Sequence, residues 1–215
     1  VMEENLKLKE ALSLFQGANG NESNLAEQFS RLANYFLYSG YLLVNSKAKV
    51  YLRDIEFYYH EETGSVKDPI MYHRNTKSNK NVKYFPLGLL NAHESGIDIT
   101  FENEQKQYRA SALIRGFNII EGETTLPIEY NRHSTHIYET LFMQASLFEG
   151  LHIEWIHEPV IPCQNDRIET AVRVNVCKFD ENGHKKAYKE GSGSCTENKK
   201  YIQDERQWRF IRRIQ

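Results

Sequence analysis

A glutamate lies among aromatic residues in the run KVYLRDIEFYYH, residues 49–60. Glu56 is followed by Phe57 and Tyr58, and the β-branched and aromatic residues of the run are typical of a strand. A carboxylate among apolar rings is suited to general-base chemistry, because a low-dielectric environment shifts its pKa into a useful range. The alternative is that Glu56 lies on the solvent face of the strand, where strand glutamates are more often found.

Two further groups of side chains have spacings that suit a site. His133, His136 and Glu139 follow one another at intervals that suit a metal. Scattered histidines on a helix are more often surface residues, so we expect no metal here. His93 begins the sequence His-Glu-Ser-Gly, which is either a substrate-facing turn or the capped start of a strand. Since the sequence contains no GxSxG, Walker or GxGxxG motif, we also expect no cofactor.

The periodicity of the apolar residues predicts the elements that have to position these side chains. Helical spacing predicts a first helix through Leu6 and Phe15, and a second over 25–36 that Asn24 caps and Gly40 closes. The further predicted elements are a hairpin of 41–46 and 49–60, strands at 96–102 and 108–120, a helix at 134–150, and strands at 168–179 and 207–214. These mixed elements predict one α+β domain over 23–215, preceded by a helical extension at 1–22.

The composition is that of an ordinary globular protein, with 40% hydrophobic and 26% charged residues among 215. The formal net charge of −2 argues against a binder that depends heavily on phosphate contacts. Two basic clusters are either a local basic face or ordinary solvated charge. They consist of Arg74, Lys77, Lys80 and Lys83, and of Arg206, Arg209, Arg212 and Arg213.

The cysteines and the apolar runs bear on the compartment. Cys163, Cys177 and Cys195 form no CxxC pair, which is typical of a reducing compartment. No apolar run reaches the ~20 residues that span a bilayer, and the acidic start is unlike a secretory signal. We therefore expect a cytoplasmic monomer without a membrane partner.

Four stretches of the chain, in consistent order, resemble the alkyladenine (3-methyladenine) DNA glycosylase family. The first, DIEFYYHEETGSVKDPIMYH, holds a Glu-x-Tyr strand end and an Asp-Pro loop. The second, ASALIRGFNIIEG, is similar to that family's strand ending in Leu-Leu-Arg with a following Glu-Gly. The third is the pair AVRVNV and QWRFI, and the fourth and weakest is LFMQAS. No single motif is specific, but together they cover roughly residues 25 to 213.

The resemblance implies a curved, mostly antiparallel sheet with surrounding helices, and an enzyme that removes an alkylated or deaminated purine from DNA. It implies that Glu56 activates a water, that Arg115 and a backbone carbonyl near Val174 hold the same water, and that Tyr58 forms a wall of the base slot. An alternative for Arg115 is a structural ion pair with Glu56 or Asp98.

Three departures from the family pattern keep other partners open. Tyr72 stands where the family has a histidine, with His73 one residue later, so either ring is a candidate to face the base. Asp98 takes the place of an asparagine that screens bases. Asn91 and Ala92 replace the Tyr-Gly whose ring wedges into the duplex, although Phe85, Leu89 or Leu90 are candidates for the wedge. An alternative function is therefore binding of a free nucleobase, a nucleoside or a single strand without repair activity, and a third is a purely structural role.

Overall fold

The computed structural model describes residues 2–121, 124–126, 135, 137–138, 141, 150–180 and 183–214. The side chains of 2–6, 121 and 124–126 are not described. The predicted helix at 134–150, with the candidate metal residues His133, His136 and Glu139 and the motif residues Gln144 and Ala145, lies largely outside this part of the chain.

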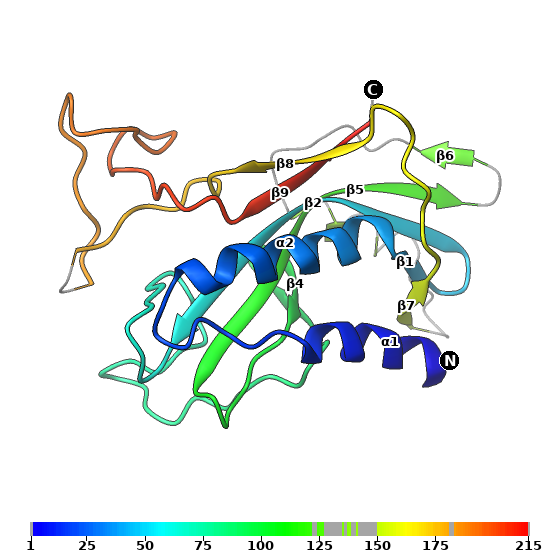
Figure 1. The fold of residues 1–215 in the computed structure, drawn as a ribbon, viewed down its shortest axis with the longest axis horizontal. Coiled ribbons are helices and arrows are strands. Elements are labelled where there is room, and N and C mark those ends of the chain that lie inside the picture. The colour runs from blue at the N-terminus through cyan, green and yellow to red at the C-terminus, as the bar shows by residue number, and fades with distance from the viewer. Residues whose placement is uncertain are drawn as a thin grey trace.

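The described residues form an α+β fold with one antiparallel sheet and two helices, which confirms the predicted fold class at this level (Figure 1). Strand β2 (Ala48–Glu61) is central. It pairs along its length with β5 (Tyr108–Glu121), while its other edge pairs first with β1 (Gly40–Val44) and then with β9 (Arg209–Arg213). The remaining strands are β3 (Leu90–His93), β4 (Gly96–Thr100), β6 (Thr124–Leu126), β7 (Ile153–His157) and β8 (Arg167–Ala171).

Both helices lie on the same side of the sheet, where they cover the apolar core (Figure 1). Helix α1 spans Met2–Ser13 and α2 spans Ser23–Tyr38. Phe29 of α2 stacks on Phe57 of β2 with ring centroids 4.5 Å apart, and Phe15 packs edge-on against Phe101 at 4.9 Å. No described helix has both the length and the apolar composition needed to cross a membrane.

The ends of α2 differ from the prediction. The helix begins at Ser23 with Glu22 at the N-cap position and no side-chain cap, so the predicted cap by Asn24 is wrong. Instead, the Asn24 amide donates to the carbonyl of Ala18 at 2.9 Å. Gly40 does not close the helix but begins β1, where a Cβ atom would lie 2.0 Å from the carbonyl oxygen of Ile156. Close packing against β7 therefore requires glycine there.

The two faces of β2 carry different chemistry. Ile55, Phe57 and Tyr59 point to the core, and the alternate positions Glu56 and His60 are polar yet also buried. No helix of the described chain lies over this polar face. Loops cover it: the backbone amide of Val174 donates to Glu56, and that of Asp68 donates to His60. The polar face is therefore part of the interior, and each of its groups needs a partner.

The strand predicted at 168–179 is correct only for its first four residues, because β8 ends at Ala171. The chain then leaves the sheet and forms an arm, residues 172–208, which reaches away from the sheet and returns to begin β9 (Figure 1). Isolated bridges such as Cys177 with Gln203 and Ala187 with Tyr201 hold the arm together. Strands β3, β6 and β7 were not predicted; each has five residues or fewer, and β3, with the sequence LNAH, contains no β-branched residue and no Phe, Tyr or Trp.

Candidate functional site

A cavity of about 420 Å³ opens beside β4 and β5 on the polar face of the sheet. This volume lies in the range of small-molecule sites. The lining combines aromatic rings and acidic side chains and includes no lysine or arginine among the described residues. It consists of Tyr58, Ile70, Met71, Tyr72, His93, Glu94, Ser95, Asp98, Ser111 and Leu113. A planar group that donates hydrogen bonds fits such a lining, whereas a phosphate does not.

Tyr72 and His93 form one aromatic wall of the cavity. Their ring centroids are 5.0 Å apart, and Tyr72 as a whole residue is 52% exposed. The amide of Asn91, on β3, donates to the Tyr72 hydroxyl. Asn91, which stands where the resemblance expects an intercalating tyrosine, therefore supports Tyr72 at the rim of the cavity.

His73, the other candidate to face the base, does not line the cavity. Its Nδ1 lies 2.6 Å from a carboxylate oxygen of buried Glu102, and its ring packs against Phe85 with centroids 4.7 Å apart. Arg109 donates to the other carboxylate oxygen of Glu102 at 3.2 Å, and its Nε donates to Glu62 at 2.7 Å. His73 thus belongs to a buried ionic cluster that fastens the loop to the sheet, and Tyr72 is the residue that borders the cavity.

Asp98 forms the acidic floor of the cavity together with His93. The Nε2 of His93 lies 3.2 Å from Asp98 Oδ1, and the Ser111 hydroxyl donates to Asp98 Oδ2 at 3.2 Å. His93 Nδ1 accepts a hydrogen bond from the backbone amide of Ser95, which leaves Nε2 to carry the ring proton towards Asp98. The sequence His93 to Gly96 is therefore the turn between β3 and β4, and three of its residues face the cavity.

Glu56 lies behind the cavity wall, with a side chain that has no solvent exposure. The Tyr58 hydroxyl donates to Glu56 Oε1, and the backbone amide of Val174 donates to Oε2 at 2.8 Å. The Nε of Arg115 is 3.6 Å from Oε2, which brings Glu56, Arg115 and Val174 together around one carboxylate. The resemblance assigned a carbonyl near Val174 to a shared water, and the structure places the amide of Val174 on the carboxylate itself.

The surroundings of Glu56 and Tyr58 shift the pKa values of both groups. Burial raises the pKa of the Glu56 carboxyl above its ordinary value, while Arg115, the Tyr58 hydroxyl and the Val174 amide act in the opposite direction. Burial, followed by the charge of Glu56, also raises the pKa of Tyr58 well above its ordinary value. The phenol therefore keeps its proton and remains a donor to the carboxylate.

A buried ionic network supports the other side of Tyr58, and the candidate site residues predicted from sequence did not include it. The guanidinium of Arg173 lies 4.9 Å from the centroid of the Tyr58 ring and pairs with Asp68 at 2.5 Å and with Asp204 at 3.3 Å. Arg206 contacts the same two carboxylates, at 3.1 and 2.6 Å. Two motifs of the resemblance, the Asp-Pro loop and AVRVNV, thus meet at this network. Their joint presence in the sequence was the only available signal for it.

The C-terminal basic cluster is structural, because each of its arginines has an acidic partner. Arg209 pairs with Asp54 at 2.6 Å, and Arg212 pairs with Asp166 at 2.5 Å. Arg213 lies 3.1 Å from Glu169. These arginines are therefore occupied within the chain.

A second cavity, of about 360 Å³, lies between α1 and α2. Apart from Arg31 and two tyrosines its lining has no ionisable side chain, and it shares no residue with the first cavity. This second cavity therefore offers few groups for acid–base chemistry.

No protein family, no curated protein and no solved structure was found to match the chain. Its function therefore has to be inferred from the cavity and from the residues around Glu56.

Proposed function

We propose that the cavity binds a damaged purine base of DNA and that the chain hydrolyses the N-glycosidic bond of that base with Glu56 as general base. The observation that carries the proposal is the double position of Tyr58. Its ring lines the cavity, and its hydroxyl donates to the buried Glu56 carboxylate. A base against this ring lies next to a carboxylate with a raised pKa, as the resemblance to the alkyladenine DNA glycosylases implies.

The proposed reaction is a displacement by water at the sugar. The water oxygen forms a bond to C1′, the bond from C1′ to the base nitrogen breaks, and the base leaves with the bonding electron pair. Glu56 accepts the proton that the water loses. A raised pKa makes the carboxylate a better proton acceptor, and the guanidinium of Arg115 keeps it ionised until the water is bound.

Recognition of the base is assigned to the rings and to Asp98. Tyr58 and Tyr72 present faces on which a purine stacks, and Asp98 accepts a hydrogen bond from an exocyclic amine or a ring N–H. The acidic lining also favours a base that carries positive charge, as N-alkylation of a purine produces.

The experiment is a base-release assay on DNA that contains hypoxanthine, ethenoadenine or 3-methyladenine, in duplex and in single-stranded form. We expect the wild type to release at least one of these bases, and Glu56→Gln to reduce the rate about 100-fold or more. Arg209→Gln, which alters an ion pair outside the cavity, is the matched control. Release that is unaffected by Glu56→Gln, or its absence on every substrate, would refute the hydrolytic role.

A second candidate function is binding of a nucleobase or nucleoside without hydrolysis. Both Glu56 oxygens already accept hydrogen bonds from the chain, and the side chain is fully enclosed, which favours a structural carboxylate. Thermal unfolding with a panel of purine nucleosides distinguishes the two functions. A binder is stabilised equally as wild type and as Glu56→Gln, and it releases no base.

A further inference from the structure

Positive charge is concentrated in two segments of the chain. Residues 69–93 contain Arg74, Lys77, Lys80 and Lys83 but no aspartate or glutamate. Residues 183–200, which form the outer part of the arm, contain five lysines and two glutamates. Since the whole chain has a net charge of −2, the remainder is strongly acidic on balance. The modest net charge thus conceals a marked separation of charge.

Most of the cations of these two segments are exposed and form no ion pair within the described part of the chain. Lys77, Lys80 and Lys83 are exposed, and so are Lys186 and Lys189. No ion pair joins any of them to a described carboxylate, in contrast to the C-terminal arginines. Lys185 and Lys200 lie over the ring of Tyr201, at 5.2 and 5.3 Å from its centroid, and so remain on the surface.

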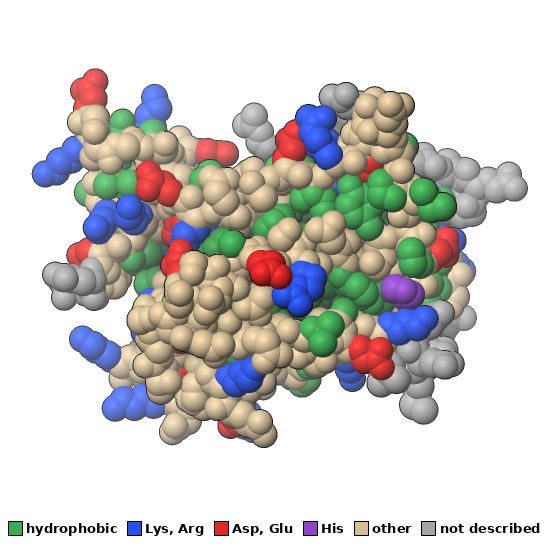
Figure 2. Space-filling model, in the orientation of Figure 1, with side chains coloured by type: hydrophobic (Ala, Val, Ile, Leu, Met, Phe, Trp, Pro, Cys, Tyr) green, Lys and Arg blue, Asp and Glu red, His purple; other side chains and the backbone are tan. Residues whose placement is uncertain are grey.

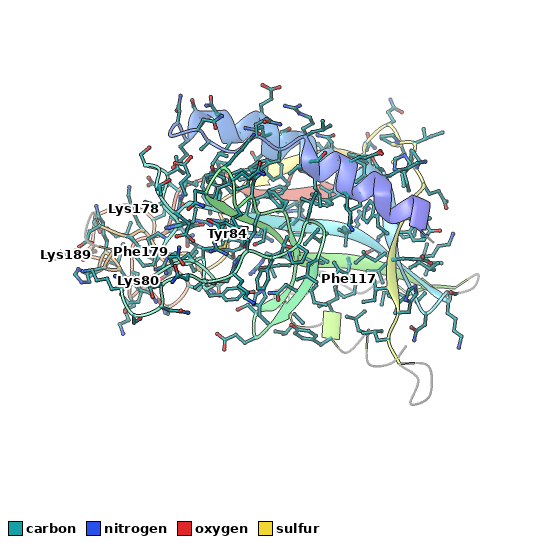
Figure 3. The ribbon with its side chains drawn as sticks, turned by 90° about the horizontal axis from the view of Figure 1, so that it is seen from below. Lys80, Tyr84, Phe117, Lys178, Phe179 and Lys189 are labelled. Atoms are coloured by element: carbon teal, nitrogen blue, oxygen red, sulfur yellow. The ribbon has the colours of Figure 1, made fainter. Side chains whose placement is uncertain are left out.

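The two segments lie at the same end of the molecule. Figure 1 shows the arm and the loop after β2 at the end opposite the N-terminus, and Figure 3 labels Lys80 of the loop and Lys189 of the arm at that end. Basic side chains project from the surface at this end in Figure 2, with acidic side chains among them. The arm is fastened to the loop, because Arg206 donates to the carbonyl of Lys67 at 3.3 Å and Arg173 pairs with Asp68.

The basic loop also begins at the rim of the cavity. Tyr72 lines the cavity, and Arg74 follows it by two residues. The cavity itself has acidic side chains and no described cation, whereas the loop beyond it has cations and no acid. This arrangement matches a molecule that carries a planar base on an anionic backbone.

We propose that the loop 74–83 and the arm segment 183–200 bind the phosphodiester backbone of a single nucleic-acid strand, one base of which reaches the cavity. The proposal rests on the proposed role of the cavity as a base site. A single strand is favoured over a duplex because the cavity takes an unpaired base, and because the arm presents Phe179, Tyr188 and Tyr201 only partly buried beside its lysines. Such rings stack on the bases of a single strand, which a duplex keeps inside.

A lipid membrane fits these segments less well. Peripheral membrane binding requires apolar side chains that enter the interface. The large exposed apolar residues of the described chain lie outside the loop 74–83 and the arm segment 183–200, although Tyr72 and Leu89 flank that loop within residues 69–93. They are Leu14, Tyr72, Leu89, Leu151, Ile161 and Ile214.

The test measures binding of a fluorescent, undamaged oligonucleotide by anisotropy as a function of salt. The same sequence as a duplex and vesicles that contain phosphatidylserine serve as competing partners. One variant combines Lys77→Glu, Lys80→Glu and Lys83→Glu, and another combines Lys185→Glu, Lys186→Glu and Lys189→Glu. A control with the same change of charge combines Lys7→Glu, Lys9→Glu and Lys47→Glu, at the other end of the molecule. Thermal unfolding of each variant checks that it is folded.

We expect the wild type to bind the single strand more tightly than the duplex. Each basic-end variant should bind about tenfold or more weakly, and its salt slope should fall by about 2, because each phosphate contact to a single strand contributes about 0.7. The control should bind like the wild type. Equal weakening in the control, preference for the duplex, or binding of vesicles but not of the strand would each overturn the proposal.

This outcome is independent of hydrolysis. The oligonucleotide carries no damaged base, so strand binding without base release would leave the inference standing and refute only the hydrolytic role. Conversely, base release from damaged nucleosides by a wild-type chain that binds no strand would overturn the inference alone.

Discussion

Arg173 and Asp68 form an ion pair in which neither side chain has any solvent exposure, although the two residues are 105 positions apart in the sequence. The pair joins the start of the arm to the loop that follows β2. Because the guanidinium also lies over the Tyr58 ring, the same contact fixes one wall of the cavity. The stability of the fold and the shape of the candidate site therefore depend on one interaction.

Replacement of Arg173 by Met should destabilise the protein by about 3–5 kcal/mol, because it leaves Asp68 buried with only Arg206 as a cationic partner. Urea denaturation measures the change in the free energy of unfolding. Arg167→Met, in an exposed pair with Glu169, is the control and should change the free energy of unfolding very little. A loss for Arg173→Met as small as that of the control would contradict the role given to the buried pair.

Replacement of Glu56 by Gln should change the stability in a manner that depends on pH. Since burial raises the pKa of Glu56, the folded state binds a proton more readily than the unfolded state, and the wild type loses stability as the pH rises through the raised value. The variant lacks this loss, so its stability relative to the wild type should increase with pH by about 1.4 kcal/mol for each unit of elevation. Denaturation curves of both proteins from about pH 4, near the ordinary glutamate pKa, to about pH 9 measure this difference in stability. A relative stability that falls as the pH rises would show that the elevation is absent.

Replacement of His60 by Asn should remove part of the acid sensitivity of the fold. Burial lowers the pKa of His60 to about 4, and its Nδ1 accepts a hydrogen bond from the Asp68 amide. Between about pH 4 and the ordinary histidine pKa, the unfolded state therefore binds a proton at His60 more readily than the folded state. Wild-type stability should fall by about 3 kcal/mol as the pH drops from the ordinary histidine value to about 4. Asparagine offers an uncharged acceptor, so a variant whose stability falls as steeply as that of the wild type would contradict the assignment.

Replacement of Tyr58 by Phe should separate the two functions of this side chain. The ring remains as a wall of the cavity, but the buried carboxylate of Glu56 loses a hydrogen bond, which should cost about 1.5–3 kcal/mol. Binding of purine nucleosides, measured by calorimetry, should be nearly unchanged. Tyr58→Leu, which removes the stacking face as well, should weaken binding. Equal binding by both variants would show that the ring does not contact the ligand.

Much of the fold could be predicted from local pattern. The hairpin of β1 and β2 and the adjoining β4 and β5 were visible because β-branched and aromatic residues fill them, and the structure confirms these strands. The prediction of a strand through 179 was wrong because Arg173, which reads as an outward-facing residue of an alternating run, is drawn into the ion pair with Asp68 and ends the pairing with β9. Local alternation does not reveal a partner so far away in the chain.

The candidate site was only partly accessible from sequence. Glu56, Arg115 and Val174 were brought together by a resemblance of motifs, and the structure places them around one carboxylate. Sequence left open whether Tyr72 or His73 faces the cavity, because adjacent residues of a loop have no fixed alternation. The choice depends on Glu102, which lies beyond β4 and holds His73 away from the cavity.

The partners of the Glu56 carboxylate also emerge from a ribosome at very different times. Tyr58 follows Glu56 by two residues, but the amide of Val174 lies 118 positions after Glu56. A nascent chain that has completed β2 and β5 already contains Glu56 and Arg115, yet it lacks the segment that closes the site. The proposed chemistry at Glu56 therefore begins only after the segment that contains Val174 has been synthesised.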